Sequence, residues 1–346
     1  MRAACYDRPF EVSVRDVPRP KAGPGEVVIR VEAAGICGTD LHLFQGEFEP
    51  RFPLIPGHEF AGVVVETGPG VTTCAPGDRV AVDPNLYCEQ CYFCRRDMQN
   101  HCENWQALGV TLPGGFAEYA AAPERSVYSI GPLSFAQGAF IEPLACVVHG
   151  QERARLRLGD SVLIFGAGPI GLLHLQLAKA AGAAKVTVVD LRNERLELAR
   201  RLGAADAVSA TDRGACDASL RAISRYGFDL VIDATGVPRV VEEAISYVKN
   251  GGTLLVFGVC PNHAEIKLSP YEIYRRDLRI VGAFALRKSF EAARNLLEAG
   301  IVKVEPLVGR TVNLTDFPAA LEMFRRGIAP MKVHVDPQNR QPPLAG

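Results

Sequence analysis

The chain has 346 residues, with 38 basic and 39 acidic side chains and a formal net charge of −1. This balance, without a long run of either sign, argues against nucleic acid or an anionic membrane as a partner. A chain of this length usually forms more than one hydrophobic core, so we expect two domains. The N-terminus lacks an apolar core of signal-peptide length, and no uncharged apolar stretch of about 18 residues occurs. We therefore expect a cytoplasmic protein without a membrane span.

The first part of the chain, to about residue 145, is rich in glycine and proline and has short apolar runs such as Val27–Val31 and Gly62–Val65. This pattern predicts an irregular, largely antiparallel β domain. From Ser161, apolar strands alternate with helical stretches, which predicts a parallel sheet and hence an α/β fold. The expected strands are Val162–Phe165, Lys185–Val189, Leu230–Ile232, Thr253–Phe257 and Leu278–Val281.

The tail after about Arg287 has a pattern of its own. An amphipathic helix is expected over Phe290–Ala299, then a short strand, then a helix over Phe317–Arg326. The closing run, Met331–Val335, alternates like an edge strand. We expect this tail to rejoin the first domain.

A glycine-rich turn directly follows the first strand of the parallel region and precedes an apolar helix, Leu172–Ala181. Its residues are Gly166, Ala167, Gly168, Pro169, Ile170 and Gly171. The glycines allow the turn, a close backbone approach to a pyrophosphate, and tight helix packing, while the helix N-terminus faces the phosphate. The turn therefore predicts a dinucleotide site.

The next strand ends in an acidic residue, Asp190, which lies 19 residues past Gly171. A carboxylate there can accept hydrogen bonds from the adenosine ribose and repels a 2′-phosphate, which favours NAD over NADP. Arg192 and Arg195 lie close by in the sequence, and either could weaken the preference for NAD over NADP. Arg195 could instead pack on the adenine. A strand-end cap is the structural alternative for Asp190.

Four clustered cysteines lie in a polar, loop-like stretch with the spacing C-x2-C-x2-C-x7-C. They are Cys88, Cys91, Cys94 and Cys102. Such spacings let thiolates converge on one tetrahedral ion, and four sulfurs leave no open position, so a structural zinc is expected. An iron–sulfur cluster and a pair of disulfides are the alternatives.

Three other stretches carry candidate metal ligands: Cys37 to His42, Gly57-His58-Glu59, and Ile141-Glu142-Pro143-Leu144. Each alone has a structural interpretation, as a buried thiol, a core histidine or a carboxylate at a helix start. Together they offer a thiolate, an imidazole and carboxylates, which suit a zinc ion with one open position. Asp40 could orient the imidazole of His58 and fix its tautomer without itself binding the metal.

These motifs together resemble the zinc-containing medium-chain dehydrogenase/reductase family. Its signature G-H-E-x2-G-x5-G-x2-V is matched by Gly57, His58, Glu59, Gly62, Gly68 and Val71. Cys-Gly-Thr-Asp, the four cysteines and the glycine turn occur in the same order. The resemblance implies a GroES-like catalytic domain (1–148) with a zinc lobe (about 84–104), a Rossmann-like doubly wound domain (149–286), and a C-terminal return to the catalytic domain (287–346).

The resemblance also implies roles for particular residues. Cys37 and His58 are expected to bind the catalytic zinc, with Glu59 as third ligand and Glu142 binding directly or through water. Thr39 is expected to begin a proton relay, which His42 continues unless its role is structural. Cys146, near the position where simple alcohol dehydrogenases carry a cysteine ligand, is a further candidate. The expected nucleotide contacts beyond the turn are Gly258, Val259, Ala283 and Phe284, and a homotetramer is implied.

The resemblance favours a zinc-dependent, NAD-linked oxidation of a secondary alcohol, with hydride transfer to the nicotinamide. A polyol is expected first, with L-threonine and a butanediol-type alcohol as alternatives. Sorbitol dehydrogenases typically carry an arginine at the position of Ala285. Threonine dehydrogenases carry an arginine after a glycine in the region of Gly282. This chain has no arginine at that position, although Arg287 is near. The alternative to an enzyme is a protein of the same family that binds a nucleotide but has no catalytic activity.

Overall fold

The computed structural model describes residues 1–48 and 50–342, which form two compact units. The first comprises Met1–Ala145, Leu286–Ala299 and the chain from Val304, and the second comprises Cys146–Ala285 with Gly300–Lys303. The first division falls inside a helix, α3 (Ile141–Ala154), three residues before the position expected from the sequence. The expected tail ran to residue 346, and residues 343–346 lie outside the described part.

The first unit is built on a seven-stranded sheet that is antiparallel except for one pair. Its strand order is β16-β17-β3-β4-β5-β9, and β8 also pairs with β3. The strands of the unit are β1 Arg2–Arg8, β2 Glu11–Asp16, β3 Glu26–Gly35, β4 Glu59–Thr67, β5 Arg79–Val82, β6 Asn85–Leu86, β7 Gln106–Ala107, β8 Tyr119–Pro123, β9 Val127–Ser129, β16 Val308–Asn313 and β17 Lys332–Asp336. Its helices are α1 Gly38–Phe44, α2 Phe135–Ala139, α9 Phe290–Glu298 and α10 Phe317–Arg325.

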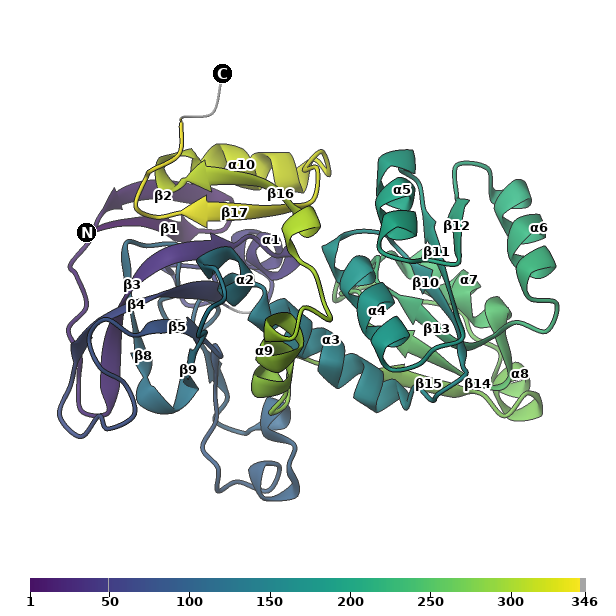
Figure 1. The fold of residues 1–346 in the computed structure, drawn as a ribbon, viewed down its shortest axis with the longest axis horizontal. Coiled ribbons are helices and arrows are strands. Elements are labelled where there is room, and N and C mark those ends of the chain that lie inside the picture. Colours follow the sequence, from purple (N-terminus) through teal and green to yellow (C-terminus); the bar gives the residue numbers. More distant parts are fainter. Residues whose placement is uncertain (49, 343–346) are drawn as a thin grey trace. The chain divides into compact units, whose positions relative to one another are not determined.

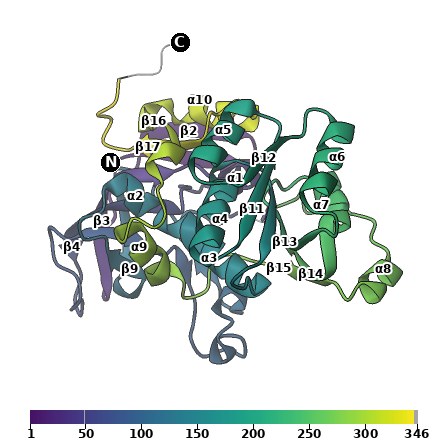
Figure 2. The same ribbon diagram turned by 45° about the vertical axis from the view of Figure 1, so that its right-hand side comes forward.

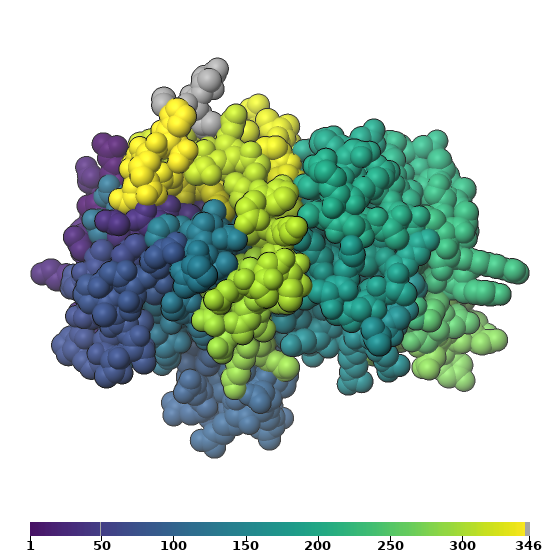
Figure 3. Space-filling view, viewed as in Figure 1, coloured from purple at the N-terminus to yellow at the C-terminus, as the bar shows by residue number. Residues whose placement is uncertain are grey.

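The C-terminal strand β17 is an inner strand, so the expectation of an edge strand was wrong. It lies between β16, which is parallel to it, and β3, which is antiparallel (Figure 1). All five of its residues are buried. The alternation of Met331–Val335 marked a strand correctly but could not show that both of its edges are paired. In Figure 3 the yellow C-terminal part of the chain lies against the purple N-terminal part, and α10 contacts β2.

The second unit contains a six-stranded, all-parallel sheet in the order β12-β11-β10-β13-β14-β15. Its strands are β10 Ser161–Phe165, β11 Lys185–Asp190, β12 Asp206–Ser209, β13 Phe228–Asp233, β14 Val248–Val256 and β15 Arg279–Gly282. The pattern did not predict β12, an edge strand whose residues are only partly buried. The chain runs outward from β10 to β12 and returns to β13, which places the point of reversal between β10 and β13.

Helices connect the consecutive parallel strands, because parallel strands need a crossover connection. They are α4 Pro169–Ala180, α5 Asn193–Arg201, α6 Arg213–Ile223, α7 Pro238–Ala244 and α8 Pro270–Arg275. Figure 2 shows α4 and α5 on one side of the sheet and α6 and α7 on the other. The two sheets match the α/β architecture expected from the sequence, with a largely antiparallel β unit and a doubly wound parallel sheet. Within the described ranges, no helix is long and apolar enough to cross a membrane.

His174 on α4 is a fully buried histidine that must remain neutral. Its Nδ1 lies 3.2 Å from Nε2 of Gln151, and its ring meets Phe257 edge to face. Burial lowers the pKa of His174 to about 3. Because the unfolded chain protonates near pH 6.5, the stability that the neutral ring contributes is complete above that pH and is lost as the pH falls from 6.5 towards 3.

We therefore expect that at pH 5 the wild-type protein has lost about 2 kcal/mol of unfolding free energy through this group alone. His174→Asn keeps an acceptor for Gln151 and should lose correspondingly less stability between pH 7.5 and pH 5 in urea unfolding. His263→Asn, at an exposed position, serves as control. Equal losses in wild type and His174→Asn would contradict the assignment.

Candidate active site and metal centre

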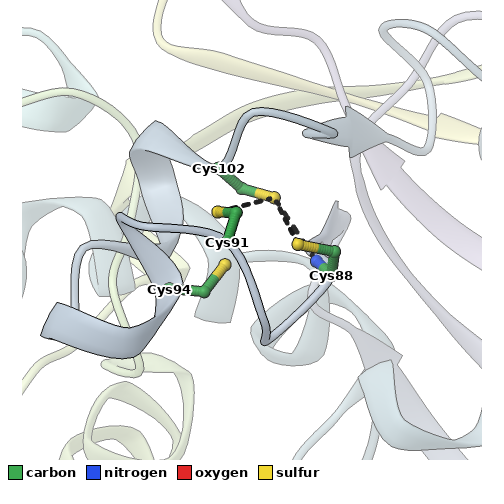
Figure 4. A group of neighbouring side chains, drawn as sticks. All are labelled: Cys88, Cys91, Cys94 and Cys102. Carbon is green, nitrogen blue, oxygen red and sulfur yellow. Dashed lines mark hydrogen bonds between the residues drawn. The ribbon is translucent and has the colours of Figure 1, made fainter.

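The four clustered cysteines converge in space. Figure 4 shows the side chains of Cys88, Cys91, Cys94 and Cys102 directed towards a common centre, and the four sulfurs lie within 4.8 Å of one another. Cys102 Sγ is 3.6 Å from Cys88 Sγ and 3.9 Å from Cys91 Sγ. None of the chain's ten cysteines, all of which lie in the described part, forms a disulfide, so the disulfide alternative fails.

Backbone N–H groups prepare two of these thiols to ionise. A hydrogen bond from the backbone of Gln90 lowers the pKa of Cys88 to about 6, and one from the backbone of Cys94 lowers the pKa of Cys91. Burial instead raises the pKa of Cys94 to about 12. A bound cation would reverse that shift, since metal binding deprotonates thiols. The donor set fits a tetrahedral zinc ion with a structural role.

A second group joins Cys37, His58 and Glu59, whose candidate ligand atoms also lie within 4.8 Å of one another. Cys37 directly precedes α1, and His58 directly precedes β4, whose first residue is Glu59. His58 is 6% exposed and Glu59 is fully buried. The carboxylate of Glu59 lies deep in the unit, away from solvent. A thiol, an imidazole and a buried carboxylate oxygen of this kind fit a zinc ion with an open position.

Asp40 supports this group from α1. Its Oδ2 accepts the backbone N–H of Cys37 at 2.8 Å, and its Oδ1 lies 3.6 Å from Nδ1 of His58. Burial lowers the pKa of His58, but Asp40 and Cys37 outweigh it and hold the pKa well above its usual value. Asp40 is thus placed to orient the imidazole, as the sequence suggested.

The structure adds a residue that the sequence analysis missed, Lys332 on β17. Its Nζ lies 2.6 Å from Oε1 and 2.5 Å from Oε2 of Glu59, in a fully buried ion pair. Burial lowers the pKa of Lys332, but the charge of Glu59 outweighs it and raises the pKa above the ordinary value. Glu142 on α3 is not within the three-residue group, yet its charge also acts on Lys332. The signal in the sequence was a run of polar residues, Lys332, His334 and Asp336, that alternates with two valines in one strand.

The expected relay residues lie on α1. Thr39 Oγ1 is 3.9 Å from Cys37 Sγ, so the hydroxyl adjoins the three-residue group. His42, one turn further along, lies with Nδ1 2.7 Å from Oε2 of Glu47. Glu47 was not predicted, because its role depends on the chain turning back after α1. The carboxylate favours the tautomer with the proton on Nδ1 and leaves Nε2 as an acceptor.

In the second unit, the glycine turn lies at the carboxyl end of β10, where the strand order reverses. Gly166 has a φ of 101°, and a Cβ at Gly171 would overlap the carbonyl oxygen of Gly166. Gly168 is the N-cap of α4 and Pro169 is its first residue. The backbone therefore has the shape that pyrophosphate binding requires.

Asp190, at the end of β11, holds this turn. Its Oδ2 accepts the backbone N–H of Ala167 at 2.7 Å, and its Oδ1 accepts that of Arg192 at 2.9 Å. The structural role proposed as an alternative is therefore real, and each oxygen keeps a second lone pair for a ribose hydroxyl. Arg195 on α5 approaches Gly168, and burial lowers its pKa.

The remaining expected nucleotide residues follow other strands of the same sheet. Gly258 and Val259 come after β14, and Ala283 and Phe284 come after β15. Val259 and Phe284 are 55% and 53% exposed, so their side chains present apolar surface at this edge. Cys146, the further candidate ligand, belongs to the second unit and is outside both metal groups found among the described residues.

A dinucleotide turn on a parallel sheet, together with a Cys-His-Glu group in a separate β unit, defines a nucleotide-dependent metal oxidoreductase. The comparisons agree with this class. Residues 23–132 match the alcohol dehydrogenase GroES-like domain, and residues 169–299 match the zinc-binding dehydrogenase model.

Individual proteins also match over nearly the whole chain. D-arabinitol dehydrogenase 1 of Uromyces fabae is 39% identical over 93% of each chain. D-altritol 5-dehydrogenase of Agrobacterium fabrum is 39% identical over 88% of this chain and 89% of its own. A protein of Sinorhizobium meliloti 1021, solved bound to NADP, superposes with a TM-score of 0.91 at 36% identity, covering 97% of this chain and 99% of its own.

The chain belongs to the zinc-binding medium-chain dehydrogenase family. It is a zinc-dependent alcohol dehydrogenase that acts on CH–OH donors with a nicotinamide nucleotide. This excludes the non-catalytic alternative and favours zinc over an iron–sulfur cluster in the lobe.

Proposed function

We propose that the protein oxidises a secondary hydroxyl of a sugar alcohol to a ketose, with NAD as hydride acceptor. The observation that carries the choice of substrate is the 39% identity, over most of the chain, to dehydrogenases named for D-arabinitol and D-altritol. The geometry supports the chemistry, because a Cys-His-Glu group, a hydroxyl beside it and a histidine–carboxylate pair lie within one unit.

Cys37, His58 and Glu59 would hold the catalytic zinc, and Asp40 keeps His58 oriented towards it. A zinc ion here supplies a Lewis acid that lowers the pKa of an alcohol hydroxyl, and NAD supplies the hydride acceptor. The four cysteines of the lobe would hold a second, structural zinc.

The released proton needs a route to solvent, which α1 can provide. Thr39 Oγ1, which lies beside Cys37, would take the proton first. His42 is three residues later on the same helix and on the same face. Nε2 of His42 can accept the proton, because Glu47 holds the proton of Nδ1. His42 is partly exposed, so it can release the proton to water.

In the nucleotide site, Asp190 fixes the turn and would accept the adenosine ribose hydroxyls. A 2′-phosphate would meet this carboxylate, which favours NAD over NADP. Arg195 would pack near the adenosine, where it reduces the penalty for NADP without removing it.

A substrate screen tests the proposal. The purified protein is assayed for nucleotide reduction with D-arabinitol, D-altritol, sorbitol, L-threonine and 2,3-butanediol, each with NAD and with NADP. We expect kcat/KM for at least one sugar alcohol with NAD to exceed that for threonine and butanediol by at least about tenfold. A preference for threonine or butanediol, or for NADP, would contradict the proposal.

A further inference from the structure

The turn after α1 brings two side chains back to His42. The helix ends at Phe44, and the backbone N–H of Glu47 donates to the carbonyl oxygen of His42 at 2.9 Å. Oε2 of Glu47 lies 2.7 Å from Nδ1 of His42. The ring centroid of Phe48 lies 5.2 Å from that of the imidazole, with the two ring planes at 50°. The turn therefore contacts the imidazole at one nitrogen and along the ring.

Phe48 reaches this position through an unfavourable backbone conformation. Its φ is 64°, in the left-handed region, where a bulky side chain is rarely found. Gly46 in the same turn has a φ of 84°, which a glycine adopts without strain. Phe48 is 45% exposed, so the burial of its own surface does not account for its place. Strain of this kind at an exposed aromatic residue indicates a functional constraint.

A histidine that passes on a proton needs a defined ring orientation, because proton transfer requires the two heavy atoms to lie within hydrogen-bond reach. The last torsion of a histidine side chain is soft, so one bond to Glu47 leaves the tilt of the ring open. Paired rings prefer defined arrangements, and Phe48 therefore restricts that tilt. Glu47 determines which nitrogen carries the proton, and Phe48 determines the direction in which Nε2 of His42 points.

We propose that Phe48 is a positioning residue of the proton relay, which holds the imidazole of His42 so that Nε2 accepts the proton arriving from Thr39. The contact with the imidazole stabilises the left-handed conformation of Phe48. The inference rests on the relay of the proposed function and not on the identity of the alcohol, so any substrate found in the screen can be used to test it.

Phe10 provides a matched control in the same unit. Its φ is also 64° and it is 65% exposed, but its ring meets Phe44 edge to face at 5.8 Å and not the imidazole. Glycine adopts the left-handed region freely, so Phe48→Gly and Phe10→Gly relieve the same backbone conformation while each removes one exposed ring. Both variants should keep a Tm within about 3 °C of the wild type. A difference in turnover between them then reports the contact with His42.

The test measures nucleotide reduction in a single turnover at pH 7.5. Phe48→Gly should lower the rate constant about tenfold, whereas Phe10→Gly should keep it within about twofold of the wild type. The KM for the alcohol should stay within about twofold in both variants. A raised KM at an unchanged rate constant in Phe48→Gly would assign the ring to substrate binding and would overturn the proposal. If Phe48→Gly does not fold, Phe48→Ala decides by the same measurements.

Two readouts separate a role in proton transfer from a role in folding. In Phe48→Gly the rate constant should rise at least about threefold with increasing HEPES concentration, because a mobile buffer base replaces the badly placed imidazole, while the wild type should not respond. Phe48→Tyr keeps the ring and should keep at least about half of the wild-type rate constant. A rate constant of Phe48→Gly that is low but independent of buffer would overturn the proposal.

The background His42→Ala separates this inference from the relay itself. His42→Ala should lower the rate constant at least about tenfold, and adding Phe48→Gly should change it by less than about twofold, because no imidazole is left to orient. If His42→Ala slows nucleotide reduction and Phe48→Gly does not, the inference is overturned and the relay stands. If His42→Ala has no effect, the relay itself fails and the inference fails with it.

Discussion

Cys37→Ser should lower kcat by at least about a thousandfold while leaving nucleotide affinity within about twofold of the wild type. A serine hydroxyl is a poor zinc ligand at neutral pH, and Cys37 supplies the only thiol of the Cys-His-Glu group. The nucleotide turn belongs to the other unit and does not depend on this side chain. Turnover is measured with the best substrate of the screen, and nucleotide binding by quenching of protein fluorescence.

Metal analysis sharpens this prediction. The wild type should contain two zinc ions per chain, and Cys37→Ser should keep one, in the four-cysteine lobe. Cys74→Ser, a partly buried cysteine of the same unit outside both metal groups, is the matched control and should keep both metal and activity. Full activity of Cys37→Ser, or activity that survives removal of the metal from the wild type, would refute the assignment of this group as the catalytic centre.

Asp190→Ser should weaken NAD binding about a hundredfold and NADP binding much less. NAD affinity falls because two charge-assisted hydrogen bonds to the ribose are missing and the glycine turn is held less firmly. For NADP, the carboxylate no longer repels the 2′-phosphate, and this gain offsets the effect of the less firmly held turn. Dissociation constants for both nucleotides, measured by calorimetry, give the comparison. Asp206→Ser, at the edge strand of the same sheet, should change neither.

Asp190→Asn separates the two roles of this side chain. Its amide oxygen can still accept a backbone N–H from the turn, so NADP affinity should stay near the wild-type value or rise. NAD affinity should still fall, because the neutral group binds the ribose less strongly. If both nucleotides weaken equally in both variants, Asp190 only holds the turn and does not select the nucleotide.

The sequence by itself determined the elements whose signal is local. The strand before Gly166, the turn and the helix after it are contiguous, so their spacing alone predicts a dinucleotide site. The four cysteines lie within fifteen residues, and short spacings already bring their thiols to one centre. The family motif places Cys37, His58 and Glu59 in one set, and the sheet register of β3 and β4 brings them together.

Only the tertiary structure decided the groups that depend on distant segments. Lys332 meets Glu59 across 273 residues of sequence, and no pattern around Met331–Val335 reveals that β17 is paired on both sides. An alternating strand can lie at an edge or inside a sheet, because alternation reports the faces of a strand and not its hydrogen-bonded neighbours. A lysine there is acceptable at an exposed edge, and in the interior it requires a carboxylate partner.

Asp190 and Glu47 illustrate the same limit at shorter range. The position of Asp190 was evident from the strand it ends, but its hydrogen bond with Ala167 depends on the pairing of β10 with β11. Glu47 reaches His42 because the chain folds back after α1. Local sequence thus determined which chemical groups the protein carries and the turn that receives the nucleotide. Long-range strand pairing decided which charges surround the metal ligands, because a buried charge is stable only where the fold brings its partner.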